Sequence, residues 1–222
     1  MYHFMRACRL ILCISMPLAI VLLCSNIVLR IPATYVYHFN DTEVIDDLGI
    51  DMYGSEMADG IAGYLNSTGD GSEFQMYIEN GSFKDPVFDE TDSAAMAKVK
   101  TTLRNELILG LVFLAVFIVD YIVLVKREYR DWLRRAGVIA AVVSIALSAV
   151  MFGLFRSGTF VRKLYDTFVG VDLSENTLIG RLLDMSFLSV AGTFALIVAL
   201  IAIAVFLFIH LQITREEKLF FD

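Results

Sequence analysis

The chain has 222 residues, of which 57% are hydrophobic and 19% charged, with a formal net charge of −7 and a mean hydropathy of +0.66. The acidic balance, which is concentrated in residues 31–104, argues against nucleic acid as a partner of that part, because binding a phosphate backbone requires an excess of Lys and Arg. The hydrophobic content favours a membrane protein over a soluble globular one.

Four apolar stretches of about 18 to 25 residues each recur along the chain. A helix rises about 1.5 Å per residue, so about 20 residues cross the hydrocarbon core of a bilayer. A buried core helix would explain any one stretch, but four in a chain of this size predict a polytopic α-helical membrane protein. The stretches run over residues 10–29, 107–125, 138–155 and 187–211.

Basic residues near the ends of these stretches predict their orientation. Five of the ten residues in 126–135 are Lys or Arg. Arg6 and Arg9 precede the first stretch, while Arg215 and Lys218 follow the last. Because cytoplasmic loops carry the excess of basic residues, we expect both termini and the 126–135 loop in the cytoplasm.

This topology divides the chain into three parts. Residues 1–30 form the first transmembrane helix with a short cytoplasmic N-terminus, and residues 31–104 form a small α+β extracytoplasmic domain. Residues 105–222 contain transmembrane helices two to four, the cytoplasmic basic loop (126–135) and an outer amphipathic segment (156–186). The outer parts contain no cysteine, so no disulfide framework is expected there.

The first half of the outer domain predicts a helix. Asp41 or Thr42 can cap it, and apolar positions recur from Val44 to Tyr64, although glycines within this range weaken it. The whole stretch 31–104 holds 14 Asp and Glu but only four Lys and Arg, which argues against anionic lipid as the partner of this domain.

The second half predicts a hairpin and then another helix. Asn80-Gly81 favours a type I′ turn, so residues 73–78 and 82–88 should form two antiparallel strands. The acidic residues at 89–92 are typical of a helix start. Nothing breaks the helical pattern from there to Leu107, so we expect the second membrane helix to extend outward by three or four turns.

The outer segment 156–186 is amphipathic. Phe160, Leu164, Phe168 and Val171 recur at near-helical spacing with charged residues between them. The pattern predicts an interfacial helix on the outer leaflet. A lid or floor for a lipid-facing pocket is the functional alternative.

Three stretches of the outer parts carry a family resemblance. Residues 78–91, 160–168 and 178–182 resemble motifs of the bacterial lipoprotein intramolecular transacylase family (Lit). Such enzymes move one acyl chain from the diacylglyceryl group of a lipoprotein's N-terminal cysteine onto its α-amino group. The resemblance implies a multi-pass protein of the bacterial cytoplasmic membrane, with membrane lipid and bacterial lipoproteins as partners and no cofactor.

The chain departs from the family where the chemistry is expected. Ala95 stands where the family has a histidine at the outer start of the second helix, and Tyr165 stands where a second histidine is usual; Asp166 follows, where the family often has an acid. Acyl transfer to an amine needs a base near neutral pH and donors for an oxyanion. Alanine supplies neither, and tyrosine, with a pKa near 10, is a poor base.

Of the three histidines, His38 alone falls outside on this topology; His3 and His210 fall near the cytoplasmic face. We interpret His38 as an interfacial residue of an aromatic belt. The alternative is a relocated base that faces Tyr165 and Asp166. No His, Asp and Glu cluster has metal-ligand spacing, so no metal site is expected.

Asp120 is the single acid well inside an apolar stretch, and we expect it to pair near the cytoplasmic interface with Lys126 or Arg127. One acid makes a poor ion pathway, which disfavours a transporter. Two functions from different classes remain. One is a lipid- or lipoprotein-binding or accessory membrane protein that lacks acyl transfer, and the other is an acyltransferase-like enzyme with a rearranged outer site. The sequence leaves open an unidentified membrane partner.

Overall fold

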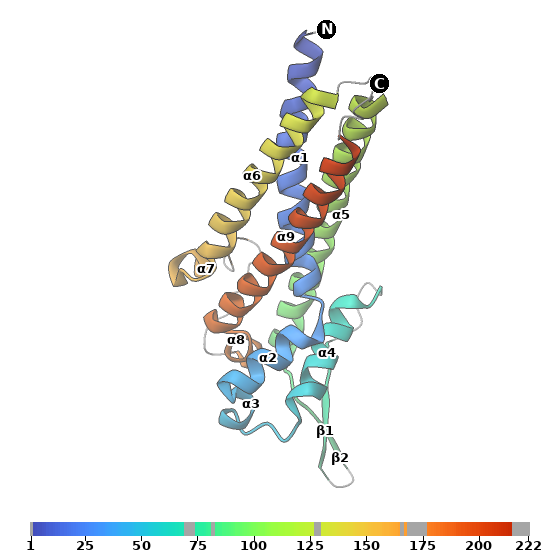
Figure 1. Ribbon diagram of the computed structural model, residues 1–222. Helices are drawn as coiled ribbons and strands as arrows, with labels where there is room; N and C mark the ends of the chain where they lie inside the picture. Colours follow the sequence, from blue (N-terminus) through green and yellow to red (C-terminus); the bar gives the residue numbers. More distant parts are fainter. Residues whose placement is uncertain are drawn as a thin grey trace. The chain divides into compact units, whose positions relative to one another are not determined.

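The computed structural model describes residues 2–68, 74–80, 83–126, 130–164, 167 and 177–214. The long helices are α1 (Tyr2–Val28), α5 (Glu90–Lys126), α6 (Arg130–Leu154) and α9 (Met185–Ile213) (Figure 1). Each is long and apolar enough to cross a membrane, which confirms the four predicted transmembrane helices. Helices suit this environment because a bilayer offers no water to satisfy backbone groups.

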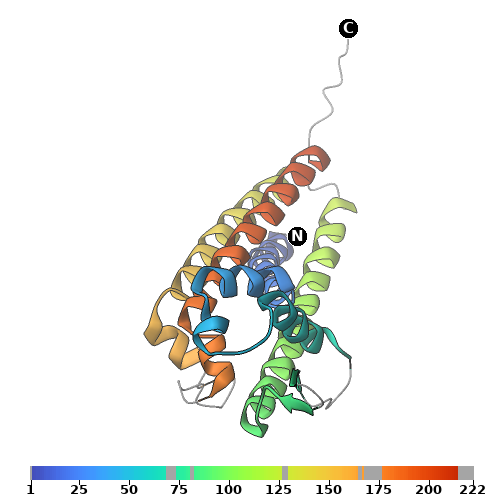
Figure 2. The same cartoon turned by 90° about the horizontal axis from the view of Figure 1, so that it is seen from below.

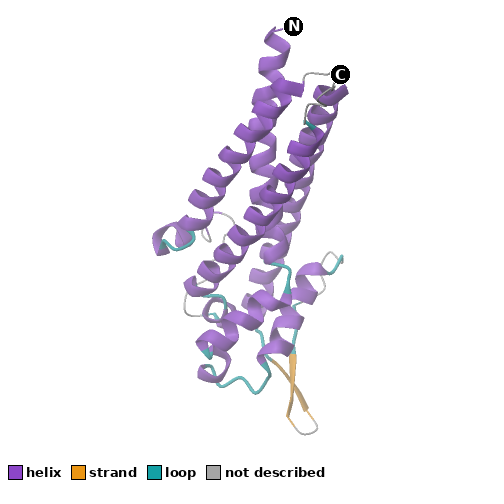
Figure 3. Cartoon of the chain, viewed as in Figure 1, coloured by secondary structure: helices purple, strands orange, loops and turns teal. Residues whose placement is uncertain are grey.

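The short elements are helical except for one hairpin, drawn in orange in Figure 3. In chain order they are α2 (Pro32–Thr42), α3 (Val44–Asp47), α4 (Gly54–Asn66), β1 (Tyr77–Asn80), β2 (Phe83–Pro86), α7 (Gly158–Leu164) and α8 (Leu178–Leu182). By its internal contacts the chain forms two compact units. The first contains Met1–Cys24, Ile108–Met151 and Leu196–Asp222, and the second contains Ser25–Leu107 and Phe152–Ala195.

The first unit is a helical bundle with a compact apolar core. Its buried residues come from all four long helices and include Leu12, Leu124, Ala140 and Ile203. Glycine and alanine in such cores let membrane helices approach closely. Gly137 is the tightest case, because a Cβ atom added there would lie 2.4 Å from the imidazole of His210.

The buried polar side chains of this bundle include His210 and Asp120. His210 Nε2 lies 3.2 Å from the carbonyl oxygen of Arg134, and its Nδ1 lies 3.0 Å from the hydroxyl of Tyr121. Asp120 is buried and hydrogen-bonded to Cys8. Among the described residues no ion pair joins Asp120 to Lys126, and Arg127 lies outside them, so the predicted pairing with one of these two residues stays a prediction.

The second unit contains the short helices and the hairpin. The helix predicted from Val44 to Tyr64 is interrupted: α3 ends at Asp47 and α4 begins at Gly54. Gly49, with φ +67°, takes the left-handed conformation that commonly follows a helix end. Sequence periodicity alone does not reveal this stop, since the apolar spacing continues across it. α2 packs against α4 (Figure 2).

The predicted hairpin is confirmed in a shorter form. β1 and β2 pair antiparallel with Asn80 opposite Phe83, so residues 81 and 82 lie between the strands, one position later than predicted. Phe74 and Phe88, which flank the strands, are both buried, and their ring centroids are 4.5 Å apart. These two rings supply the core beneath the hairpin.

The predicted extension of the second membrane helix toward its N-terminus is also confirmed, since α5 begins at Glu90, and that this end faces outward stays a prediction. The predicted interfacial helix corresponds in part to α7, which covers Phe160 and Leu164. Phe168 and Val171 lie outside the described residues. Placement on the outer leaflet stays a prediction, as do the cytoplasmic termini and the three-part division of the chain.

Candidate functional site

The sequence points to His38, Tyr165 and Asp166 as candidate residues and to Ala95 as a replaced histidine. Tyr165 and Asp166 lie outside the described residues, so their meeting with His38 stays a prediction. His38 and Ala95 are both described, and both belong to the second unit.

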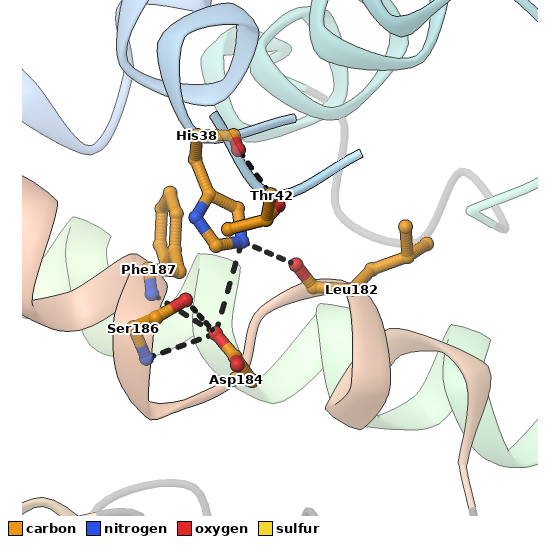
Figure 4. Close-up of polar contacts among 6 residues, drawn as sticks. All are labelled: His38, Thr42, Leu182, Asp184, Ser186 and Phe187. Atoms are coloured by element: carbon orange, nitrogen blue, oxygen red, sulfur yellow. Dashed lines mark hydrogen bonds and ion pairs between the residues drawn. The ribbon is translucent and has the colours of Figure 1, made fainter. Parts of the chain in front are cut away.

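His38 lies on α2 and points toward the turn between α8 and α9 (Figure 4). Its Nε2 atom is 3.2 Å from the carbonyl oxygen of Leu182 and 3.7 Å from Oδ1 of Asp184. The contact joins residues 144 positions apart in the chain. It therefore connects the segment after the first membrane helix to the segment before the last.

Aromatic rings enclose the imidazole. Phe187 packs edge-on at 5.4 Å between ring centroids, and Phe39 lies at 5.7 Å. The His38 side chain is 1% exposed. It is thus buried inside the protein and does not lie in an exposed aromatic belt, because the side of α2 that carries it packs against Leu182 and Phe187.

The hydrogen bond at Nε2 determines the tautomer of the neutral ring. A carbonyl oxygen only accepts, so Nε2–H donates to Leu182 and Nδ1 carries the free lone pair. Nδ1 is buried and has no hydrogen-bond partner among the described residues. Burial lowers the pKa of His38, an effect that the Asp184 carboxylate and the Leu182 hydrogen bond oppose. The neutral form, which has a basic Nδ1, is therefore favoured near pH 7.

Asp184 serves as the N-terminal cap of α9. Its Oδ1 accepts hydrogen bonds from the backbone N–H of Ser186 at 2.9 Å and of Phe187 at 3.0 Å, and from the Ser186 hydroxyl at 2.6 Å. Aspartate is preferred at this position because it satisfies the unpaired N–H groups of the first turn. The sequence signalled the cap, because Asp184 stands immediately before an apolar stretch. No feature of the sequence signalled that Asp184 lies close to His38.

Ala95 lies on the buried side of α5. One turn earlier on the same helix, Asp92 is buried and accepts a hydrogen bond at Oδ1 from the backbone N–H of Ile179 at 3.0 Å. The start of α5 is therefore tied to α8 by a carboxylate, and the buried Ala95 side chain beside it is only a methyl group. That Ala95 occupies the family's histidine position stays a prediction.

The chemistry available to this arrangement is limited. Within the described part of the chain, no group of three or more His, Cys, Asp and Glu residues could hold a metal ion. The one imidazole of the second unit is enclosed by protein, and its free nitrogen faces no described donor. A general base must reach the proton it removes directly or through one water, so an enclosed imidazole is poorly placed to meet a substrate.

No protein-family model matches the sequence, and no curated protein matches it either. Solved structures do match the fold. A histidine-to-alanine variant of the membrane integral lipoprotein intramolecular transacylase Lit from Bacillus cereus superimposes with a TM-score of 0.71 and 16% identity, over 95% of this chain and 94% of that one. Another Bacillus cereus Lit structure gives a TM-score of 0.68 and 16% identity, over 96% and 97% of the two chains. The chain thus has a Lit-like fold and is a multi-pass membrane protein by its four apolar helices.

Proposed function

We propose that this protein is a bacterial lipid- or lipoprotein-binding membrane protein that keeps the Lit-like fold and has lost acyl transfer. In this role it holds a membrane lipid, or the diacylglyceryl terminus of a lipoprotein, at its outer face without moving an acyl chain. An accessory role beside a membrane partner belongs to the same proposal.

One observation carries the proposal: the one histidine of the outer unit is buried, with Nε2 engaged by Leu182 and the ring covered by Phe39 and Phe187. Acyl transfer from an ester to an amine requires a base at the attacking nitrogen and donors at the oxyanion. Ala95 supplies neither. The low identity to Lit, 16%, is compatible with a shared fold and a changed site.

The test is the chemical state of a lipoprotein's N-terminus. The chain is expressed in a bacterium whose lipoproteins carry two acyl chains and a free amino terminus, with Bacillus cereus Lit expressed in parallel as the active control. Intramolecular transfer does not alter the mass of the lipopeptide, so fragmentation in the mass spectrometer must locate each acyl chain.

We expect the amino terminus to remain free with this chain and to become acylated with Lit. The membrane-inserted, folded state of the chain is checked by its monodisperse elution in detergent. An acylated amino terminus would overturn the loss of acyl transfer. Binding is tested separately by native mass spectrometry of the purified protein with a synthetic diacylglyceryl-cysteine peptide. A protein that retains neither this peptide nor phospholipid would overturn the binding role.

A second candidate is an acyltransferase-like enzyme with a rearranged site. The unpartnered Nδ1 of His38 favours it, because a neutral imidazole with a free lone pair is the form that accepts a proton. In this scheme Nδ1 takes a proton from the attacking amine as the C–N bond forms and returns it to the glyceryl oxygen as the ester C–O bond breaks. Tyr165 donates a hydrogen bond to the oxyanion, with Asp166 beside it. Amino-terminal acylation that disappears with His38→Gln and with Tyr165→Phe would establish this candidate over the first.

A further inference from the structure

We infer that His38 is an acid-sensitive latch that holds α2 to the α8–α9 turn at neutral pH and releases it on protonation. The latch is defined by His38 on one side and by Leu182, Asp184 and Phe187 on the other. The latch concerns the opening of the second unit. It applies equally to a lipid-binding protein and to an acyltransferase-like enzyme.

The latch is the polar centre of an aromatic contact. Tyr35, one turn before His38 on α2, stacks on Phe187 with ring centroids 4.9 Å apart, and Tyr37 packs edge-on against Phe194 at 5.3 Å. His38 supplies the side-chain hydrogen bond from α2 to the turn, through Nε2 and the Leu182 carbonyl (Figure 4). Opening this contact would separate the chain after the first membrane helix from the chain before the last.

Protonation of His38 is unfavourable at the Nδ1 side of its imidazole ring. The Nε2–H donor and its bond to Leu182 remain. Nδ1 gains a hydrogen in a buried position where no described residue offers an acceptor. A buried donor without an acceptor and a buried positive charge both destabilise the closed contact. In the open state water solvates both, so acid favours opening.

The charged groups around His38 moderate this effect without reversing it. Asp184 on the turn and Asp41 on α2 both attract a protonated imidazole. Asp184 is 51% exposed and therefore screened, and its Oδ1 already caps α9. A protonated His38 would compete for that oxygen and weaken the cap. Arg181 on α8 carries a positive charge, but its side chain is exposed and water therefore screens its effect on His38. The net result is a lowered pKa for His38 in the closed state, with burial as the largest cause.

His210 shows what a buried histidine with two partners looks like. Its Nε2 faces the Arg134 carbonyl at 3.2 Å, and its Nδ1 faces the Tyr121 hydroxyl at 3.0 Å. A tyrosine hydroxyl can donate to a neutral ring and accept from a protonated one. His38 lacks such a partner among the described residues, so protonation there leaves the new Nδ1–H without an acceptor.

The experiment is hydrogen–deuterium exchange of the full chain in detergent micelles at pH 7.5 and 5.5, corrected for the intrinsic pH dependence of exchange. Peptides covering 34–42 and 178–187 report on the latch, and peptides covering the 77–86 hairpin serve as the internal control. The variants are His38→Gln, which can still donate to Leu182 but does not titrate, and Asp184→Asn, which keeps a capping oxygen but removes the charge.

In the wild-type protein we expect exchange in the two latch peptides to rise in acid, at most about tenfold because the open-state pKa is near 6.5. The hairpin should not change. His38→Gln should abolish the rise, and Asp184→Asn should enlarge it because the closed state loses its attraction for the proton. A wild-type protein without the rise, or a rise that persists in His38→Gln, would overturn the latch. If His38→Gln fails to fold, the wild-type peptides and Asp184→Asn still decide the question.

Discussion

The Asp92 carboxylate accepts the backbone N–H of Ile179 at 3.0 Å, 87 positions further along the chain. Asp92 also belongs to a capping pair at the start of α5: the Asp92 N–H donates to Oδ1 of Asp89 at 2.7 Å, and the Asp89 N–H lies 3.5 Å from Oδ2 of Asp92. One buried carboxylate thus begins the second membrane helix and fixes α8 beside it.

Replacement of Asp92 by alanine should destabilise the second unit. The substitution leaves the Ile179 N–H buried without a partner and removes half of the capping pair, so we expect a loss of about 2–4 kcal/mol in the free energy of unfolding. The measurement is thermal unfolding in micelles followed by intrinsic fluorescence. Asp59→Ala, at an exposed acid on α4, is the matched control and should change stability by less than about 0.5 kcal/mol. Equal effects of the two variants would contradict this account of Asp92.

Gly137 offers a sharp packing test in the first unit. A Cβ at this position would lie 2.4 Å from Cε1 and Nε2 of His210, so Gly137→Ala must displace the imidazole from Arg134 and Tyr121. We expect a loss of about 1–3 kcal/mol, measured by unfolding in a denaturing detergent titration.

The matched control for that substitution is Gly63→Ala on α4. No heavy atom lies within 4 Å of its added Cβ. Because alanine is the better helix former, this variant should gain about 0.5–1 kcal/mol. A Gly137→Ala protein as stable as Gly63→Ala would show that the His210 contact is not tight.

Asn26 holds a polar network near the C-terminal end of α1. Its amide donates to the Leu103 carbonyl at 2.6 Å and to Oε2 of Glu106 at 3.4 Å, and its oxygen accepts from Nε of Arg30 at 2.9 Å. Asn26→Ala leaves three polar groups short of a partner and should cost about 1–3 kcal/mol. Asn66→Ala, which removes one exposed bond to the Arg30 carbonyl, should cost much less in the same thermal assay. The reverse order would contradict a network centred on Asn26.

The thermal stability of the wild-type protein should fall in acid because of His38. Its pKa is lowered in the folded protein, so the unfolded chain binds the proton first. The contribution to stability is full above the ordinary pKa near 6.5 and is lost as pH falls from there toward the folded pKa, at about 1.4 kcal/mol per pH unit at most. The unfolding temperature at pH 7.5 and 5.5 should therefore differ more in the wild type than in His38→Gln. An identical difference in both proteins would assign the acid effect to other groups.

Local signals in the sequence were sufficient for the elements that depend on local physics. Apolar length predicts the membrane helices, because crossing a bilayer imposes a length and a composition that no other element shares. The acidic residues at 89–92 predict the start of α5, and Asn80-Gly81 predicts the hairpin to within one residue. The break between α3 and α4 was missed, because Gly49 ends the helix by its backbone conformation and not by any change in the apolar pattern.

What the sequence by itself determined is therefore a membrane protein with four spanning helices, a small outer α+β part and no histidine between His38 and His210. The tertiary structure alone decided that His38 is buried against Leu182 and Asp184, and that Asp92 binds the N–H of Ile179. These relationships join segments far apart in the chain. Their distances depend on which helix faces pack together, and the periodicity of a single sequence marks an apolar face without identifying its partner.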